Sequence, residues 1–399
     1  MLTLRQLFLQ NLGQTSDSPL MLEIEHAKGI YMYDNTGKKY IDLISGVSVS
    51  NVGHGHPKVV EAVKNQVDKY MHLMVYGEYI QSPQVLLAEK LVGLLPESLS
   101  SVYLVNSGSE ATEGALKLAK RFTGRGEIIS FRKAYHGSTH GALSVMGDSE
   151  FTKPFQPLLP SVRFLNFNAI EDLKEITEKT ACVIVEPIQG EAGIIMPVNN
   201  FLQELRKRCN ETGTLLIFDE IQTGFGRTGK LFAFEKFNVV PDILLIAKGF
   251  GGGMPIGAFV APKHIMDSFK TNPVLGHITT FGGHPVSCAA ALASLEVIME
   301  NNYIAEAEAK GELFRKMLRS HSLIQGFRGT GLFQAVELPS FEILLNFIKS
   351  AVREGVVSDW FIFCNDHFRI SPPITITEAE IEETSYLILR ALDNVKKLL

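Results

Sequence analysis

Polar or glycine residues stand at or shortly after the ends of five short apolar runs in the middle of the chain. The runs are Val102–Val105, Glu127–Phe131, Ala181–Val185, Leu215–Phe218 and Ile243–Ala247, followed in turn by Asn106–Glu110, Tyr135–Gly137, Glu186, Asp219 and Lys248. In open α/β sheets, ligands bind beyond the carboxyl ends of the strands. One such end would mean little, but five on one edge predict the wall of a binding site.

Lys248 offers the most specific chemistry of these residues. It follows a buried run and precedes four glycines between positions 249 and 253, which let the backbone pass close to a ligand. A desolvated lysine has a lowered pKa, as a Schiff-base amine requires. The alternative is a lysine whose stem packs and whose amine reaches solvent.

Asp219 and the segment after Val105 could hold the two charged ends of a cofactor. A carboxylate at the end of a buried run needs a cation or strong donors, and a protonated pyridine nitrogen would be such a partner. The alternative is that Asp219 caps the loop that follows. Gly108 and Ser109 open a predicted helix, whose free N–H groups suit a phosphate. The alternative there is a simple N-cap by Ser107 or Ser109.

Two other patterns carry less weight. Gly224, Gly226 and Gly229 match G-x-G-x-x-G, but no helical pattern follows them, so nucleotide binding is not predicted. His54 and His56 lie among glycines and a proline and favour a turn. The four cysteines have no metal-ligand spacing. We therefore predict free thiols and no metal site.

Apolar strands that alternate with helical patterns predict an α/β fold with a mainly parallel sheet covered on both faces. Val162–Leu165 is a sixth strand. The predicted helices between strands are Ser109–Phe122, Ile170–Lys179 and Phe201–Glu211. Further elements are strands at Leu22–Glu25 and Ile30–Asp34, helices at Glu296–Met317 and Leu344–Glu354, a strand preceded by a turn within Phe327–Glu337, and a final helix with a capping box of Thr377 and Glu380.

With these motifs in their order, the chain resembles the class III (ornithine, acetylornithine and 4-aminobutyrate) aminotransferases of the fold-type I group. The matching motifs are Asn106–Ala111, Tyr135–Gly137, Glu186–Gly193, Leu216–Gly229, Pro241–Gly257, Thr279–Gly283 and Arg369–Pro373. They cover about residues 45 to 375. The resemblance implies a large domain over residues 49–295 and a small α+β domain from both termini, residues 1–48 and 296–399.

The resemblance also implies pyridoxal 5'-phosphate (PLP) as cofactor and assigns residues to it. Lys248 would form the Schiff base and move the substrate proton, and Asp219 would keep the pyridine nitrogen protonated. The remaining cofactor contacts would come from Gly108 and Ser109 at the phosphate, Tyr135 on one ring face, Gln222 at the ring hydroxyl, and Thr280 at the phosphate of the neighbouring subunit. A homodimer with shared active sites follows.

The substrate residues that the resemblance implies are Arg369, Glu191, Glu186 and Thr279. Arg369 would bind the carboxylate of 2-oxoglutarate or glutamate, and Glu191 would neutralise it in the other half-reaction. Glu186 would lie at the wall of the site and Thr279 would face substrate. The expected reaction moves an amino group, with the terminal amine of N-acylornithine as the first candidate, to 2-oxoglutarate.

Two departures from the family bear on the donor. Ser138 stands where many relatives carry an arginine for a substrate carboxylate, and Arg132, Lys133 and Arg163 are candidates for the missing charge. Val47 stands where ornithine aminotransferases carry a tyrosine, which disfavours free ornithine. The alternatives are 4-aminobutyrate, ornithine or lysine as donor, a PLP aminomutase or decarboxylase, and a non-catalytic dimeric homologue.

The composition excludes several classes of partner. The chain has 399 residues, 45% hydrophobic and 20% charged, and a net charge of −5. A slightly acidic chain gives no electrostatic case for nucleic acid or an anionic membrane. No run is apolar enough to span a membrane and no signal peptide is evident. We expect a cytoplasmic protein.

Overall fold

The computed structural model describes residues 2–398, and a seven-stranded sheet forms its centre. Its strand order is β4 (Ser101–Val105), β10 (Gly257–Ala261), β9 (Ile243–Ile246), β8 (Leu215–Asp219), β7 (Thr180–Val185), β5 (Glu127–Phe131), β6 (Val162–Leu165). Only β10 runs antiparallel to its neighbours, which leaves the other six strands parallel. The predicted mainly parallel sheet is confirmed, and the sequence did not predict β10.

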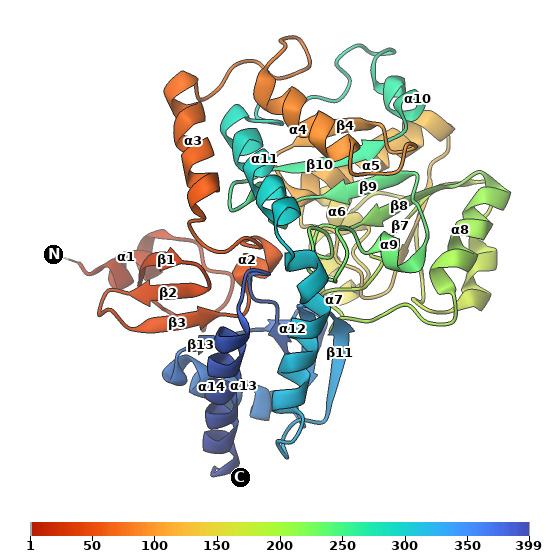
Figure 1. The fold of residues 1–399 in the computed structure, drawn as a ribbon. Helices are drawn as coiled ribbons and strands as arrows, with labels where there is room; N and C mark the ends of the chain where they lie inside the picture. The colour runs from red at the N-terminus through yellow and green to blue at the C-terminus, as the bar shows by residue number, and fades with distance from the viewer. Residues whose placement is uncertain (1, 399) are drawn as a thin grey trace.

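Helices bury both faces of this sheet. Neighbouring residues of one strand enter different cores: Leu216 and Phe218 join the larger cluster, whereas Ile217 joins a second one. The flanking helices are α3 (Pro57–Lys69), α4 (Ser82–Val92), α5 (Gly108–Thr123), α8 (Phe201–Thr212) and α11 (Pro285–Glu300) (Figure 1). The alternation explains why the strands read as continuous apolar runs.

The two ends of the chain build the rest of the molecule together (Figure 1). One sheet has the order β1 (Ile24–Lys28), β2 (Tyr31–Asp34), β3 (Lys39–Asp42), β13 (Val356–Val357), and β3 pairs in parallel with β13. The other has the order β11 (Gly326–Thr330), β12 (Phe333–Glu337), β15 (Cys364–Ile370), β14 (Trp360–Phe361). The helices are α12 (Tyr303–Leu318), α13 (Phe341–Glu354) and α14 (Glu378–Lys396). A small α+β unit from both termini is thereby confirmed.

Three elements differ from the sequence predictions. Residues Ile170–Glu175 form a 3-10 helix instead of an α-helix. The single helix predicted from Glu296 is two helices, because the chain leaves helical geometry at Asn301. The segment Phe327–Glu337 is a hairpin of two strands that turns at Gly331, whose φ of 57° suits glycine. The predicted domain boundary at residue 295 falls inside α11, and the division into domains stays a prediction.

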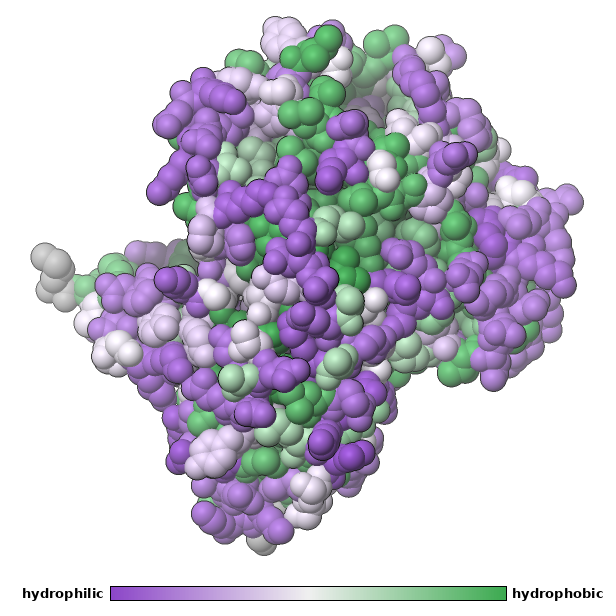
Figure 2. Space-filling view, in the orientation of Figure 1, coloured by the Kyte–Doolittle hydropathy of each residue, from purple (hydrophilic) through white to green (hydrophobic). Residues whose placement is uncertain are grey.

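The remaining helices are short: α1 (Leu4–Asn11), α2 (Ser45–Ser48), α6 (His140–Ser144), α7 (Ser149–Thr152), α9 (Phe234–Phe237) and α10 (Lys263–Met266). Within residues 2–398 we find no helix with the length and apolarity to cross a bilayer. Figure 2 shows hydrophobic residues gathered over the upper half of the molecule near α11, while hydrophilic residues cover α8.

Candidate active site

A cavity of about 650 Å³ opens at the carboxyl edge of the large sheet. Nine of the predicted residues line it: Gly108, Ser109, Tyr135, Glu186, Glu191, Asp219, Gln222, Lys248 and Arg369. Trp360 and Ile362 add a wall from the small sheet. The cavity therefore lies where strand ends of the large domain meet the hairpin that carries Arg369.

Lys248 follows β9 and opens a single 3-10 turn. Its φ of 49° is a left-handed conformation that non-glycine residues rarely adopt. The next residue is glycine for a steric reason, because a Cβ on Gly249 would lie 2.5 Å from Nδ2 of Asn51. Burial lowers the pKa of Lys248, and Arg369 adds to this, although Glu191, Asp219 and Glu186 oppose it. A lowered pKa keeps more of the amine neutral and nucleophilic.

Asp219 ends β8, and its side chain is 4% exposed. Oδ1 accepts the N–H of Ile221 at 3.0 Å, and Oδ2 lies 2.7 Å from Nδ1 of His136. The local cap that the sequence allowed is thus present, and it leaves the carboxylate in the cavity wall. Asp219 can still face a ring nitrogen bound there.

His136 is a site residue that sequence reasoning missed. It lies in the Tyr135–Gly137 motif, but no role was assigned to it. Its ring is buried, and within residues 2–398 Nε2 has no hydrogen-bond partner. By contacting Asp219 it orients the carboxylate, as groups behind a ligand usually do.

The N-terminus of α5 faces the cavity through Gly108 and Ser109. Ser107 is the N-cap, and its hydroxyl accepts the N–H of Glu110 at 3.2 Å. The N–H groups of a helix's first turn have no partner within the helix. A Cβ on Gly108 would lie 2.8 Å from Cδ1 of Ile221. Ser107 can therefore cap α5 while the N–H groups of its first turn stay available to an anion. Gly108 lies where α5 and Ile221 approach most closely.

Arg369 and Glu191 form a buried ion pair across the cavity. Nη2 of Arg369 lies 3.2 Å from each carboxylate oxygen of Glu191, and Nε donates to Oδ1 of Asp359 at 2.8 Å. Gln222 donates to Oε1 of Glu191 at 2.9 Å and lies 3.4 Å from Nη1 of Arg369 through its carbonyl. The guanidinium also lies 4.4 Å from the ring centre of Phe361.

The electrostatics of the Arg369–Glu191 pair favour its charged form. Burial alone would raise the pKa of Glu191, but the charges of Arg369 and Lys248 outweigh it and lower that pKa. Burial raises the pKa of Asp359 even though Arg369 attracts its charge. Sequence reasoning missed Asp359, which lies ten residues before Arg369. Glu191 and Asp359 thus occupy Nη2 and Nε of the Arg369 guanidinium.

Glu186 follows β7 and is 5% exposed. Its oxygens accept the N–H of Tyr135 at 3.2 Å and that of Gly190 at 3.0 Å. Burial and the nearby charge of Asp219 raise the pKa of Glu186 well above its usual value. Glu186 thereby fixes the loops on either side of the cavity.

Thr279 and Thr280 do not line this cavity. Thr279 lines a separate surface hollow with Tyr76, and the exposed Thr280 has its hydroxyl 3.5 Å from the Tyr76 hydroxyl. Val47 does line the cavity, and Ser138 lies outside its lining, 3.2 Å from the Tyr135 hydroxyl. The two threonines stay predictions for a neighbouring subunit's site.

The residues fit a ligand with an anionic group, an aromatic ring and an aldehyde. The first turn of α5, the Asp219 carboxylate and an amine with a lowered pKa surround one cavity. PLP carries a phosphate, a pyridine ring and a carbonyl, so its groups match this donor set.

Known aminotransferases are similar to this chain in sequence and in fold. Residues 12–392 match the family model "Aminotransferase class-III". The chain is 41% identical over 360 residues to the acetylornithine aminotransferase of Methanopyrus kandleri, covering 89% of this chain and 90% of that protein. The ornithine aminotransferase of Toxoplasma gondii superposes with a TM-score of 0.91 at 29% identity, over 98% of this chain and 94% of that one.

A third relative bears on the cofactor. An amine transaminase from an uncultivated Pseudomonas species, solved in a PLP-bound form, has a TM-score of 0.88 at 27% identity, with 96% of this chain and 98% of that one covered. The family and this neighbour imply PLP dependence. The chain belongs to the class III aminotransferases and is an aminotransferase.

Proposed function

We propose that this aminotransferase moves the terminal amino group of an N-acylornithine to 2-oxoglutarate, which leaves as glutamate. The observation that carries the proposal is the Arg369–Glu191 pair beside Lys248. A bidentate guanidinium suits a carboxylate, and a carboxylate that can replace the ligand lets one site serve two substrates. The 41% identity to an acetylornithine aminotransferase supports the same donor.

PLP would be held by residues that already surround the cavity. Its phosphate would accept the N–H groups of Gly108 and Ser109, its ring nitrogen would face Asp219, and Gln222 would bind the ring hydroxyl. Tyr135 would cover one face of the ring. When bound, the cofactor supplies an electron sink for the substrate carbon. Lys248 holds and returns the proton of that carbon, a task for which a lowered amine pKa is suited.

Glu191 would decide which substrate Arg369 accepts. With the ion pair closed, Arg369 is neutralised, which suits a terminal amine because its reacting carbon carries no carboxylate. With Glu191 displaced, both nitrogens of the fork can bind a carboxylate of 2-oxoglutarate. Asp359 keeps Nε in place during the exchange.

Ser138 and Val47, the two departures from the family, narrow the choice of amino donor. Ser138 cannot replace a guanidinium fork, so a donor carboxylate needs another partner. Val47 offers no hydrogen bond to a free α-amino group, whereas an acylated amine needs none from it. These points favour an acylated amine over free ornithine.

We further propose a homodimer. Thr280 is exposed and lies outside the cavity of its own chain, and Ile80 nearby on the same hollow is 95% exposed. A second subunit over this hollow would cover Ile80 and bring Thr280 to a neighbouring phosphate.

A donor panel tests the proposal. The holoenzyme is mixed with 2-oxoglutarate and N-acetylornithine, N-succinylornithine, ornithine, 4-aminobutyrate or lysine, and glutamate is quantified. We expect the acylated ornithines to give the highest kcat/KM and Lys248→Ala to give none. A higher kcat/KM for an unacylated donor would contradict the assignment of the donor. An amine that disappears without glutamate would indicate a decarboxylase or aminomutase.

A further inference from the structure

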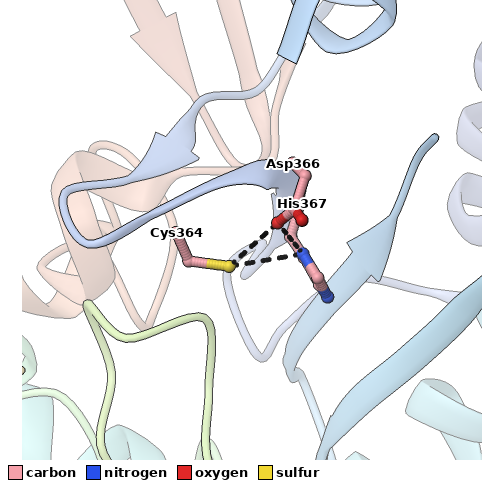
Figure 3. A group of neighbouring side chains, drawn as sticks. All are labelled: Cys364, Asp366 and His367. Carbon is pink, nitrogen blue, oxygen red and sulfur yellow. Dashed lines mark hydrogen bonds and ion pairs between the residues drawn. The ribbon is translucent and has the colours of Figure 1, made fainter. Parts of the chain in front are cut away.

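Cys364, Asp366 and His367 form a cluster outside the cavity, at the start of β15 (Figure 3). Sγ of Cys364 lies 3.2 Å from Oδ1 of Asp366 and 3.3 Å from Nδ1 of His367. Nδ1 of His367 lies 2.6 Å from the same Asp366 oxygen. Three different ligand types thus converge on one point.

We propose that Cys364, Asp366 and His367 bind one divalent cation of the Zn²⁺ class. Tetrahedral Zn²⁺ holds sulfur at about 2.3 Å and nitrogen or oxygen at about 2.0–2.2 Å, which sets its ligand atoms roughly 3.3–3.6 Å apart. The observed separations are 2.6–3.3 Å, so the side chains need to open by less than about 1 Å.

The ligand set selects the class of cation. Mg²⁺ and Ca²⁺ prefer oxygen ligands, whereas a thiolate with an imidazole suits borderline cations such as Zn²⁺. On binding, the thiol proton leaves to solvent and the sulfur coordinates as a thiolate. Cys364 and Asp366 are partly exposed, which leaves the fourth position to water.

The surroundings of His367 support this site independently. The ring is fully buried, yet Nε2 has no hydrogen-bond partner among the residues that the structure describes. Glu337 is its cross-strand partner on β12, and its Oε2 lies 3.9 Å from Nε2. Metal-binding histidines usually donate their other N–H to a carboxylate. With a cation on Nδ1, the proton must sit on Nε2 and face Glu337.

One neighbouring residue, Arg328, limits the affinity of the site for a cation. Nη1 of Arg328 lies 4.0 Å from Sγ of Cys364. Its charge favours the thiolate but repels a cation. Among residues 2–398, three ligands are available to the cation, all within one strand. We therefore expect reversible binding of one ion per chain.

The site adjoins the residue that pairs with Arg369. The N–H of Phe363, one residue before Cys364, donates to the Glu191 carbonyl at 3.0 Å, and that of Ile362 lies 3.2 Å from Oε2 of Glu191. The Cys364 side chain packs so closely on Gly193 that a Cβ there would lie 2.5 Å from Sγ. The cation site would be present whichever amino donor the enzyme uses.

Equilibrium dialysis of the holoenzyme against Zn²⁺, followed by elemental analysis, tests the site. Co²⁺ substitution supplies a second readout, since tetrahedral thiolate-bound Co²⁺ absorbs strongly in the red, away from the cofactor. We expect one ion per chain and the red band in the wild type, and loss of both in Cys364→Ser and Asp366→Asn. Asp393→Asn is the matched control, because Asp393 is an exposed carboxylate that pairs with a histidine, His321, and not with a cysteine.

Three results would contradict the cation site. An unchanged stoichiometry in Cys364→Ser or Asp366→Asn would overturn the proposal, as would the absence of binding to wild type at about 10⁻⁴ M Zn²⁺, a concentration at which even weak, reversible calcium modules bind their ion. Equal loss in Asp393→Asn would also overturn it. Because Asp366 is partly exposed, its variant should fold, and the transaminase activity of each variant is measured separately as a check on folding.

Discussion

Two acidic side chains bind the Arg369 guanidinium and hold it in position. Asp359 binds Nε from the same hairpin, and Glu191 binds Nη2 from a distant loop. Removing one partner of a buried pair is costly because it leaves a charge without compensation. In the proposed exchange, a substrate carboxylate would avoid this cost by taking the place of Glu191.

Replacing Glu191 tests this exchange. In Glu191→Gln, 2-oxoglutarate no longer competes with a charged side chain, and a charge-assisted hydrogen bond contributes about 1.5–3 kcal/mol. We expect the KM for 2-oxoglutarate to fall roughly 10-fold and kcat/KM for the amine donor to fall by a similar factor. Steady-state kinetics of each half-reaction measures both. Arg369→Lys is the counterpart and should raise the KM for 2-oxoglutarate more than that of the donor; equal changes would argue against the exchange.

Lys248 should make the stability of the apoprotein depend on pH. Its pKa is lowered in the folded protein, so the folded chain binds fewer protons there than the unfolded chain. The stabilising contribution is fully present above the unfolded pKa of about 10.4 and is lost as pH falls through the lower folded pKa. We expect Lys248→Met to gain stability over wild type at pH 7, and the gain to shrink towards pH 10. Urea unfolding at several pH values measures this, and a constant difference would contradict it.

At the scale of elements, α14 begins with a reciprocal cap. The Thr377 hydroxyl accepts the N–H of Glu380 at 3.2 Å, and the Glu380 carboxylate accepts the N–H of Thr377 at 2.8 Å. Helix α1 carries the same arrangement at Thr3 and Gln6. The two helices differ in burial, because α14 buries seven side chains and α1 buries none.

This pair of caps allows a matched test. Thr377→Ala should cost about 1 kcal/mol and lower the midpoint of thermal unfolding by roughly 1–3 °C. Thr3→Ala should leave the midpoint unchanged, since α1 can fray without exposing a core. Differential scanning calorimetry of both holoenzymes distinguishes them. Equal shifts would mean that α1 contributes to the cooperative unit after all.

At the scale of the whole molecule, the proposed dimer makes activity depend on association. Ile80 is 95% exposed beside the hollow that Thr279 lines. Ile80→Asp should bury a charge at the interface, produce monomers and lower kcat/KM more than 10-fold, because Thr280 could no longer serve a neighbour. Light scattering after size exclusion, with glutamate assays, checks this. The control Val198→Asp changes an exposed residue next to α8 and should stay dimeric and active.

Local sequence patterns determined most of the helices and strands, and they determined the part of the site that lies at the strand ends. Five strand ends predicted the carboxyl edge that carries Asp219 and Lys248, because parallel strands all end at one edge of the sheet. The predicted strands of the large sheet and β2 agree with the structure within about one residue at each end, whereas β1 ends three residues later than predicted and the single strand predicted in Phe327–Glu337 is the hairpin β11–β12. Strands β3, β10, β13, β14 and β15 were not predicted from the sequence. The break at Asn301 was missed because the apolar pattern continues across it.

Tertiary structure alone decided which distant residues meet. Arg369 and Glu191 are 178 residues apart, and His136 and Asp219 are 83 apart, so no local pattern pairs them. The resemblance supplied the first pair but not the second. Cys364 and His367 are close in sequence, yet only the paired strands β12 and β15 put Glu337 behind the imidazole. Periodicity and propensity report on neighbours in the chain, whereas charge pairs and ligand sets are fixed by packing between elements.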